Sequence, residues 1–238
     1  MRRFYAPAEN FDGDKISLGV EESKHLRDVL RLSVGASVSV FDGAGKEFLC
    51  EIAVIGKKEI ILKITKEVNP TAPESNLDLT LAVALLKGEK FDLVVQKAVE
   101  LGVTILVPLN TKRADVKLKD AEKKIERWRR IALEACKQSG RAKLMRIEMP
   151  ADFEKFIAAA EGTRILFAER GGESFAEMKA TEKITAIIGA EGGWETSEIE
   201  AAREKGFQTV TLKGRILRAE TAAIVAAAIL QNQFGDLV

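Results

Sequence analysis

The spacing of apolar residues changes near residue 70, and this change predicts two domains. Before it, short segments alternate apolar and polar residues or run apolar with many β-branched side chains, as β-strands do. The expected strands are 1–5, 37–41, 48–55 and 59–65, with the last two forming a hairpin. Apolar residues at helical spacing predict one short helix over 21–32. Residues 1–68 are therefore expected to form a small β-barrel that contains one helix.

Residues 69–76 form the predicted linker, because they hold two of the five prolines and no large apolar residue. From residue 77 the pattern alternates between strands and helices. The expected strands are 77–86, 103–108, 144–148, 164–168, 184–188 and 209–212, and the expected helices are 89–101, 121–138, 152–160, 197–205 and 220–233. This alternation predicts an α/β domain over 77–238, with a mostly parallel sheet and helices on both faces.

Composition excludes several classes of site. The chain is 46% apolar and 31% charged, which is ordinary for a globular protein. Its one histidine, His25, argues against a histidine-based metal site or a Ser-His-Asp triad. Cys50 and Cys136 lie far apart, which favours a reducing, cytosolic setting without structural zinc. The apolar run 219–230 is too short and too polar to span a membrane.

The net charge of +1 conceals a concentrated basic stretch. Residues 111–146 contain thirteen Lys and Arg against five Asp and Glu. Such a stretch on a nearly neutral protein is the expected footprint of polyanion binding, although it could also simply solvate the outer face of a long helix. A second, weaker basic set in the N-terminal part comprises Arg2, Arg3, Lys24, His25, Arg27 and Arg31.

Two glycine-containing stretches follow predicted strands, at 187–194 and 212–221. Since open α/β sheets bind ligands beyond the carboxyl ends of their strands, the two loops are expected to meet at a ligand-binding edge. Neither stretch has the GxGxxG or GxxxxGK[ST] spacing of the dinucleotide and phosphate loops. Arg218 at this edge could hold a phosphate, polarise a carbonyl oxygen, or be a surface cation, and Glu220 could be favoured there by the helix dipole alone.

Glu134, Gln138, Ser139 and Arg141 cluster at the end of the long basic helix, where they could stabilise the helix terminus or line a nucleotide pocket. Six ordered motifs then resemble one family, the bacterial 16S ribosomal RNA uridine-N3 methyltransferases of the S-adenosylmethionine-dependent SPOUT class. They are 1–5 (MRRFY), 25–31 (HLRDVLR), 97–103 (KAVELGV), 134–141 (EACKQSGR), 189–193 (GAEGG) and 216–222 (ILRAETA). The resemblance runs nearly from end to end.

The resemblance implies an N-terminal PUA-like barrel, a C-terminal α/β domain with a deep trefoil knot, and a cytoplasmic homodimer that modifies ribosomal RNA without a metal. It implies Arg218 and Glu220 as the catalytic pair. The residues it assigns to S-adenosylmethionine are Phe167, Ala168, Glu169, Ile188, Gly189, Ala190, Glu191, Gly192, Gly193, Leu212, Ile216, Leu217, Thr221 and Ala222. The residues it assigns to RNA are Arg2, Arg3, Arg27, Arg31, Lys87, Arg113, Gln138, Ser139 and Arg141.

Two departures from the family pattern lie in the expected cofactor loops, since the family usually has proline at Ala190 and a Gly-Pro pair at Lys213-Gly214. Two other readings of the chain remain open. A nucleotide-using metabolic enzyme on a doubly wound sheet fits the alternating pattern, but not the missing phosphate fingerprints or the basic stretch. A non-catalytic RNA-binding adaptor fits the basic stretch equally well.

Overall fold

The computed structural model describes residues 2–57, 59–116, 120–175, 178–179 and 181–237 of the 238-residue chain. Its contacts divide the chain into two compact units. The N-terminal unit consists of Met1–Glu74 together with Cys136–Leu144, and the C-terminal unit consists of Ser75–Ala135 and Met145–Val238. The small unit therefore includes a short segment that lies far along the chain from the rest of it.

The N-terminal unit is built on a sheet of six strands within the described residues. In spatial order these are β1 (Arg3–Tyr5), β4 (Ser37–Phe41), β5 (Glu47–Ile55), β6 (Ile60–Val68), β3 (Lys15–Ser17) and β2 (Phe11–Asp12). The predicted hairpin is confirmed, because β5 and β6 pair antiparallel. Alternate side chains of these strands, among them Phe4, Ile16, Val40 and Ile52, form a closed apolar core. The strands β2 and β3 were not predicted.

The helix predicted over 21–32 is present in a different form. It begins as the α-helix α1 (Val20–Lys24) and continues as the π-helix η2 (His25–Val29). Leu26 is fully buried in the N-terminal core, whereas Val29 is 69% exposed. Two residues after this turn, Arg31 has a φ of 51°, in the left-handed region that side-chain-bearing residues seldom adopt. A short 3₁₀ turn, η1 (Ala8–Asn10), precedes β2.

The C-terminal unit contains a parallel sheet in the order β10-β8-β7-β12-β11-β13, with β9 also paired to β8. The strands are β7 (Asp78–Ala84), β8 (Ile105–Asn110), β9 (Arg146–Ile147), β10 (Ala151–Asp152), β11 (Thr163–Phe167), β12 (Lys183–Ile188) and β13 (Gln208–Val210). All the predicted strands of this region are present, and β10 is an addition. The expected parallel α/β fold is confirmed.

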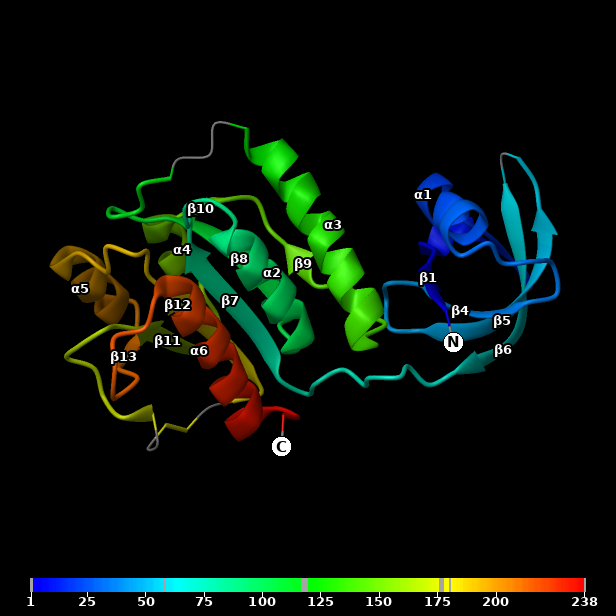
Figure 1. Ribbon diagram of the computed structural model, residues 1–238. Helices are drawn as coiled ribbons and strands as arrows, with labels where there is room; N and C mark the ends of the chain where they lie inside the picture. The colour runs from blue at the N-terminus through cyan, green and yellow to red at the C-terminus, as the bar shows by residue number, and fades with distance from the viewer. Residues whose placement is uncertain (1, 58, 117–119, 176–177, 180, 238) are drawn as a thin grey trace. The chain divides into compact units, whose positions relative to one another are not determined.

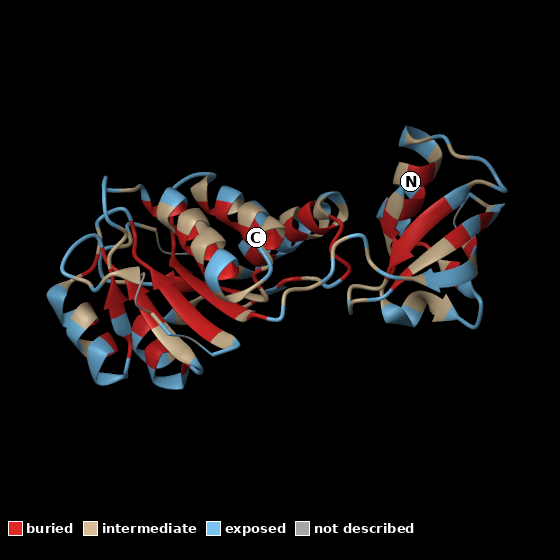
Figure 2. Ribbon diagram, turned by 90° about the horizontal axis from the view of Figure 1, so that it is seen from below, coloured by how far each residue is buried: buried red, intermediate tan, exposed pale blue. Residues whose placement is uncertain are grey.

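Helices cover both faces of this sheet (Figure 1). They are α2 (Lys90–Glu100), α3 (Ala121–Ser139), α4 (Phe153–Ala159), α5 (Thr196–Glu204) and α6 (Ala219–Phe234). On one face, side chains of α4 and α5 share an apolar cluster with Leu166 and Ile187 of the sheet. On the other, α6 contacts β7 and β12 and packs along α2. The central strands β7 and β12 are accordingly buried along their length except at their first residues, Asp78 and Lys183 (Figure 2).

Strand register brings three loops to one edge of the sheet. Phe167 at the end of β11 pairs with Ile188 at the end of β12 and with Val210 at the end of β13. Because the strands are parallel, the three loops that follow them leave the sheet side by side. Within the described residues, no helix is long and apolar enough to cross a membrane, and no three His, Cys, Asp or Glu side chains gather as a metal site requires.

Candidate active site

The loops after β11, β12 and β13, together with the start of α6, enclose a cavity of about 260 Å³. Its walls are Phe167, Ala168, Glu169, Ile188, Gly189, Ala190, Glu191, Gly193, Trp194, Leu212, Arg215, Ile216, Leu217, Arg218, Ala219 and Ala222. These include every residue expected at the cofactor except Gly192 and Thr221. Both loops singled out from the sequence therefore meet at one cavity, as expected from the strand ends.

Trp194 is the largest wall residue that the sequence prediction missed. Its indole Nε1 donates a hydrogen bond of 2.9 Å to the carbonyl oxygen of Phe167, and its ring lies 5.3 Å from that of Phe153. A Cβ on Gly189 would lie 3.0 Å from the indole, so glycine is what allows this close packing. Trp194 directly follows the glycine-rich segment 189–193, and this position in the sequence could have identified it as a cavity residue.

A tight turn closes the loop after β12. The Gly193 N–H donates to the carbonyl oxygen of Ala190 at 2.9 Å, and Gly193 has a φ of 70°, which favours glycine. A Cβ at this position would lie 3.4 Å from a carboxylate oxygen of Glu169 on the neighbouring loop. The turn thus leaves main-chain groups and one carboxylate facing the cavity, where a ligand could reach them.

Glu191 also lines the cavity and is held by a cation of α2. The Lys90 Nζ lies 2.8 Å from a Glu191 carboxylate oxygen. Partial burial alone would raise the pKa of the Glu191 carboxyl, but the hydrogen bond and charge of Lys90 together with main-chain hydrogen bonds outweigh it and keep the pKa below its ordinary value. Glu191 is therefore ionised at neutral pH and forms an ion pair with Lys90 at the cavity wall.

The predicted catalytic pair lies where the chain enters α6. Arg218 is the N-cap residue, is exposed, and lines the cavity. Glu220 lies in the first turn, where the helix dipole favours a carboxylate, and is only 9% exposed. Its Oε2 is buried and makes no hydrogen bond with the described residues. A buried carboxylate oxygen is costly without a hydrogen-bond donor, so this oxygen calls for a functional explanation.

Two cations of the C-terminal unit that were expected at RNA are paired with carboxylates. The Lys87 Nζ lies 2.6 Å from the Asp115 Oδ2 in an exposed ion pair. The Arg113 Nε donates to Glu195 at 2.7 Å, and its Nη1 donates to the Gly192 carbonyl oxygen at 3.0 Å. The RNA-binding role of both cations stays a prediction, and for Arg113 the structure adds a contact with the glycine loop.

The basic helix α3 is amphipathic. Ile125, Trp128 and Ala132 form its buried face, and the cations Lys123, Lys124, Arg127, Arg129 and Arg130 are exposed. The Phe91 and Trp128 rings stack with centroids 4.3 Å apart and so attach α3 to α2. Two more cations of the basic stretch, Lys117 and Lys119, lie outside the described residues. A charged surface is present, as the sequence indicated.

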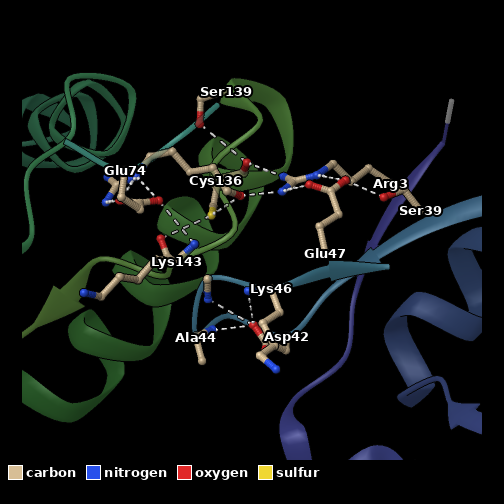
Figure 3. A network of polar contacts seen from close by, with 12 residues as sticks. Arg3, Ser39, Asp42, Ala44, Lys46, Glu47, Glu74, Cys136, Ser139 and Lys143 are labelled. Atoms are coloured by element: carbon tan, nitrogen blue, oxygen red, sulfur yellow. Dashed lines mark hydrogen bonds and ion pairs between the residues drawn. The ribbon is translucent and has the colours of Figure 1, made fainter. Parts of the chain in front are cut away.

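Arg3, also expected at RNA, lies inside a polar network of the N-terminal unit (Figure 3). Arg141, expected at RNA as well, belongs to the same network. The Arg3 guanidinium donates to both oxygens of Glu47 at 3.0 Å and to the carbonyl oxygens of Cys136 and Arg141. Arg141, 5% exposed, forms an ion pair of 2.7 Å with Glu74. The Arg3 guanidinium thus joins the segment 136–144 to β1, and the Arg141 guanidinium joins it to Glu74, so an RNA phosphate would have to compete with these partners.

The other residues expected at RNA are closer to solvent. Arg2 and Gln138 are exposed, Ser139 is half-buried, and Arg31 is exposed beside the π-helix. Arg27 donates to Asp28 and to the carbonyl oxygens of Gly56 and Lys57. These residues differ in exposure and partners, and their RNA-binding role stays a prediction.

Comparison with known proteins gives a consistent result. Residues 73–231 match the RNA methyltransferase domain, and residues 18–65 match the RNA methyltransferase PUA domain. The ribosomal RNA small subunit methyltransferase E of Aquifex aeolicus is 33% identical over 233 residues, covering 98% of this chain and 100% of that protein. The homologous enzyme of Bacillus subtilis is 30% identical over 91% of this chain and 90% of its own.

Two solved structures superpose on nearly the whole chain. The small subunit methyltransferase E of Neisseria gonorrhoeae, bound to S-adenosyl methionine, has a TM-score of 0.92 and 32% identity, and the match covers 100% of both chains. A Legionella pneumophila protein in complex with the bound cofactor SAM also has a TM-score of 0.92, with 33% identity over 99% of both chains. On these matches, the chain belongs to the RNA methyltransferase family and carries that family's PUA domain.

Proposed function

We propose that this protein transfers a methyl group from S-adenosylmethionine to N3 of a uridine in 16S ribosomal RNA. The observation that carries the proposal is the cavity formed where three parallel strands end, with two glycines in its walls. We place the reaction in the cytoplasm, where bacterial ribosomal RNA and S-adenosylmethionine are both found.

The residues of the cavity suit this cofactor. Ile188, Leu212 and Leu217 offer apolar walls to a flat base, and glycines allow main-chain groups to approach it closely. The carboxylates of Glu169 and Glu191 suit a cationic ligand. When bound, S-adenosylmethionine supplies a methyl group on a positively charged sulfur, which an electron-rich nitrogen accepts without a metal.

The uridine N3 carries a proton and lies on the base-pairing edge, so the base has to be unpaired before it can react. Arg218 stands at the cavity with an exposed guanidinium, which can stabilise the negative charge that grows on the uracil as this proton leaves. Glu220, two residues along α6, does not line the cavity, but its buried Oε2 has no donor among the described residues, which supports this carboxylate as the acceptor of the proton. The exposed cations of α3 and the N-terminal unit would bind RNA phosphates.

We also propose that the protein is a homodimer joined through α6. One face of this helix, with Ala223, Ala227 and Leu230, is buried within its own chain. The opposite face carries Ile224, Val225, Ala228 and Ile229, which are apolar yet only half-buried. Such a helix needs a further apolar surface, and a second copy would supply it next to Arg218. A Val225→Glu variant should run as a monomer in light scattering, whereas wild-type protein should run as a dimer.

The finer topology is part of the same proposal: a closed PUA-like barrel in residues 1–68 and a trefoil knot in 77–238. In support of a knot, β12 lies between β7 and β11, and the chain returns from the edge strand β13 to place α6 over β7 and β12. When a single molecule is stretched by force at both ends, its unfolded contour length should be shorter than that of a fully extended chain of 238 residues. The reason is that pulling tightens a knot but does not untie it. A full-length contour would exclude it.

The function is tested by incubating bacterial 16S ribosomal RNA with the protein and S-adenosylmethionine, followed by nucleoside mass spectrometry. We expect one new N3-methyluridine per RNA, and RNA affinity that falls steeply with salt. Arg218→Ala should abolish methylation, while the control Arg203→Ala, whose guanidinium bonds to Thr209 outside the cavity, should retain it. RNA binding without methylation would indicate an adaptor, and calorimetric binding of NAD or ATP in place of S-adenosylmethionine would indicate a metabolic enzyme.

A further inference from the structure

Arg113 connects two loops that are distant in the sequence of the C-terminal unit. It lies on the loop after β8, which ends at Asn110. Through its Nη1 it donates to the carbonyl oxygen of Gly192 at 3.0 Å, and through its Nε it donates to Glu195 at 2.7 Å. One guanidinium thus holds both the backbone of the glycine loop and the residue that caps α5.

Gly192 is the residue that makes this approach possible. A Cβ at Gly192 would lie 3.1 Å from the Cβ of Arg113 and 3.3 Å from its carbonyl oxygen, closer than most such contacts. Both chain neighbours, Glu191 and Gly193, line the cavity, but Gly192 does not. Glycine at position 192 therefore makes room for Arg113 and not for a ligand.

A second contact ties the same two loops together. The Lys112 N–H donates to one oxygen of Glu198 at 2.9 Å, and the Glu195 N–H donates to the other at 3.0 Å. Glu198 is only 1% exposed, so it is an internal anchor rather than a surface charge. The loop after β8 is consequently fixed against the exit of the glycine loop, and Arg113 is aimed at Gly192 from a fixed base.

We propose that Arg113 is a positioning residue for the cofactor, which fixes the Gly192 carbonyl and thereby the course of residues 189–194 along the cavity. This inference rests on the proposed use of S-adenosylmethionine. The ion pair with Glu195 is half-exposed on both sides, at 46% and 42%, and such pairs contribute little. The position of the glycine loop therefore depends on the charged hydrogen bond from Arg113 to the Gly192 carbonyl oxygen and on the close packing of the two main chains.

The test is calorimetric titration of the full-length protein with S-adenosylmethionine in the absence of RNA. Arg113→Ala should weaken binding roughly tenfold, the loss expected for one charge-assisted hydrogen bond. Arg113→Lys should recover part of the affinity. The matched control is Lys112→Ala, which removes a neighbouring cation whose Nζ donates to the Ser197 hydroxyl and not to the glycine loop within the described residues, and it should bind the cofactor like wild type.

Steady-state kinetics separate the two roles of Arg113, because a positioning role predicts that Arg113→Ala raises KM for S-adenosylmethionine, whereas a role confined to RNA binding would raise KM for RNA alone. Gly192→Ala retains Arg113 but places a methyl group against it, so this variant should also raise KM for S-adenosylmethionine. Unchanged cofactor affinity in Arg113→Ala, or an equal loss in Lys112→Ala, would overturn the inference. Wild-type protein that does not bind S-adenosylmethionine would instead contradict the proposed function.

Discussion

Trp194 and Phe167 join two walls of the cavity through a single hydrogen bond of 2.9 Å from the indole Nε1 to the main-chain carbonyl oxygen. Phe167 ends β11 and Trp194 follows the glycine loop after β12, so this bond sets the distance between the two loops. Both residues line the cavity.

Trp194→Phe should keep the ring packing against Phe153 and lose only this bond. We expect the free energy of unfolding to fall by about 1–3 kcal/mol, because the Phe167 carbonyl oxygen loses its indole donor. Affinity for S-adenosylmethionine, measured by calorimetry, should fall severalfold. The matched control is Trp128→Phe, which loses a 2.9 Å bond to Asp92 away from the cavity and should reduce stability without changing cofactor affinity.

Gln231 is a buried polar tether at the other end of α6. It is fully buried, its Nε2 donates to the Gly102 carbonyl oxygen at 3.1 Å, and its Oε1 accepts from the Ser75 hydroxyl at 2.8 Å. Gln231→Leu leaves both partners unsatisfied, so urea unfolding should show a loss of about 2–4 kcal/mol. Asn232→Ala, at the neighbouring exposed position, should change the free energy of unfolding little. If the two variants lost the same stability, the buried hydrogen bonds of Gln231 would have no special role.

The Arg3–Glu47 pair predicts an acid-sensitive N-terminal unit. Burial raises the pKa of the Glu47 carboxyl, but the hydrogen bonds from Arg3 and Ser39 outweigh burial and lower its pKa below 4.5. The ionised carboxylate therefore stabilises the fold above pH 4.5, and this contribution is lost as the pH falls through the lowered pKa.

Glu47→Gln should cost about 3 kcal/mol at neutral pH, because it leaves the Arg3 guanidinium without its carboxylate partner. The unfolding free energy of the variant should also depend less on pH below 4.5 than that of wild type. The control is Glu67→Gln, which removes an exposed pair with Lys46 and should be nearly neutral. If both variants behaved alike in denaturant unfolding, the buried pair would have no special role.

Neither thiol should be reactive in the native protein. Burial raises the pKa of Cys50 to about 12 and that of Cys136 to about 11, from an ordinary value of 9.0. The thiolate is the reactive form, so iodoacetamide at pH 8 should label both cysteines in urea and neither in native protein. Stability should fall as the pH rises above 9.0, since only the unfolded chain then ionises. Mass spectrometry of native protein with a labelled Cys136 would contradict this.

Local pattern was sufficient for most of the fold. The alternation after residue 77 predicted the parallel sheet, because a fully buried strand needs a continuous apolar run and a covering helix needs a periodic one. It missed β10, which has two residues, Ala151 and Asp152, too few to show a period. It also predicted one regular helix over 21–32, where the chain forms α1 and a π-helical turn.

The site followed partly from the same local signals. Glycines after two strands marked the edge where the cavity forms, and the resemblance gave most of its lining residues. Arg113 and Gly192 looked like separate RNA and cofactor residues, yet they touch each other. Arg3 and Arg141 were expected at RNA, yet Arg141 is buried and Arg3 half-buried in one network. Their partners lie tens of positions away, beyond the reach of any local pattern.

The sequence by itself determined the strands, the helices and the glycine loops, because these depend on neighbours within a few residues. Only the tertiary structure decided which cation meets which carboxylate or carbonyl oxygen. Strand order and register set those meetings: Phe167, Ile188 and Val210 pair across three strands, and their loops therefore converge. Folding buries some charged side chains, and burying a charge without a partner is costly. These side chains therefore form ion pairs and hydrogen bonds within the protein.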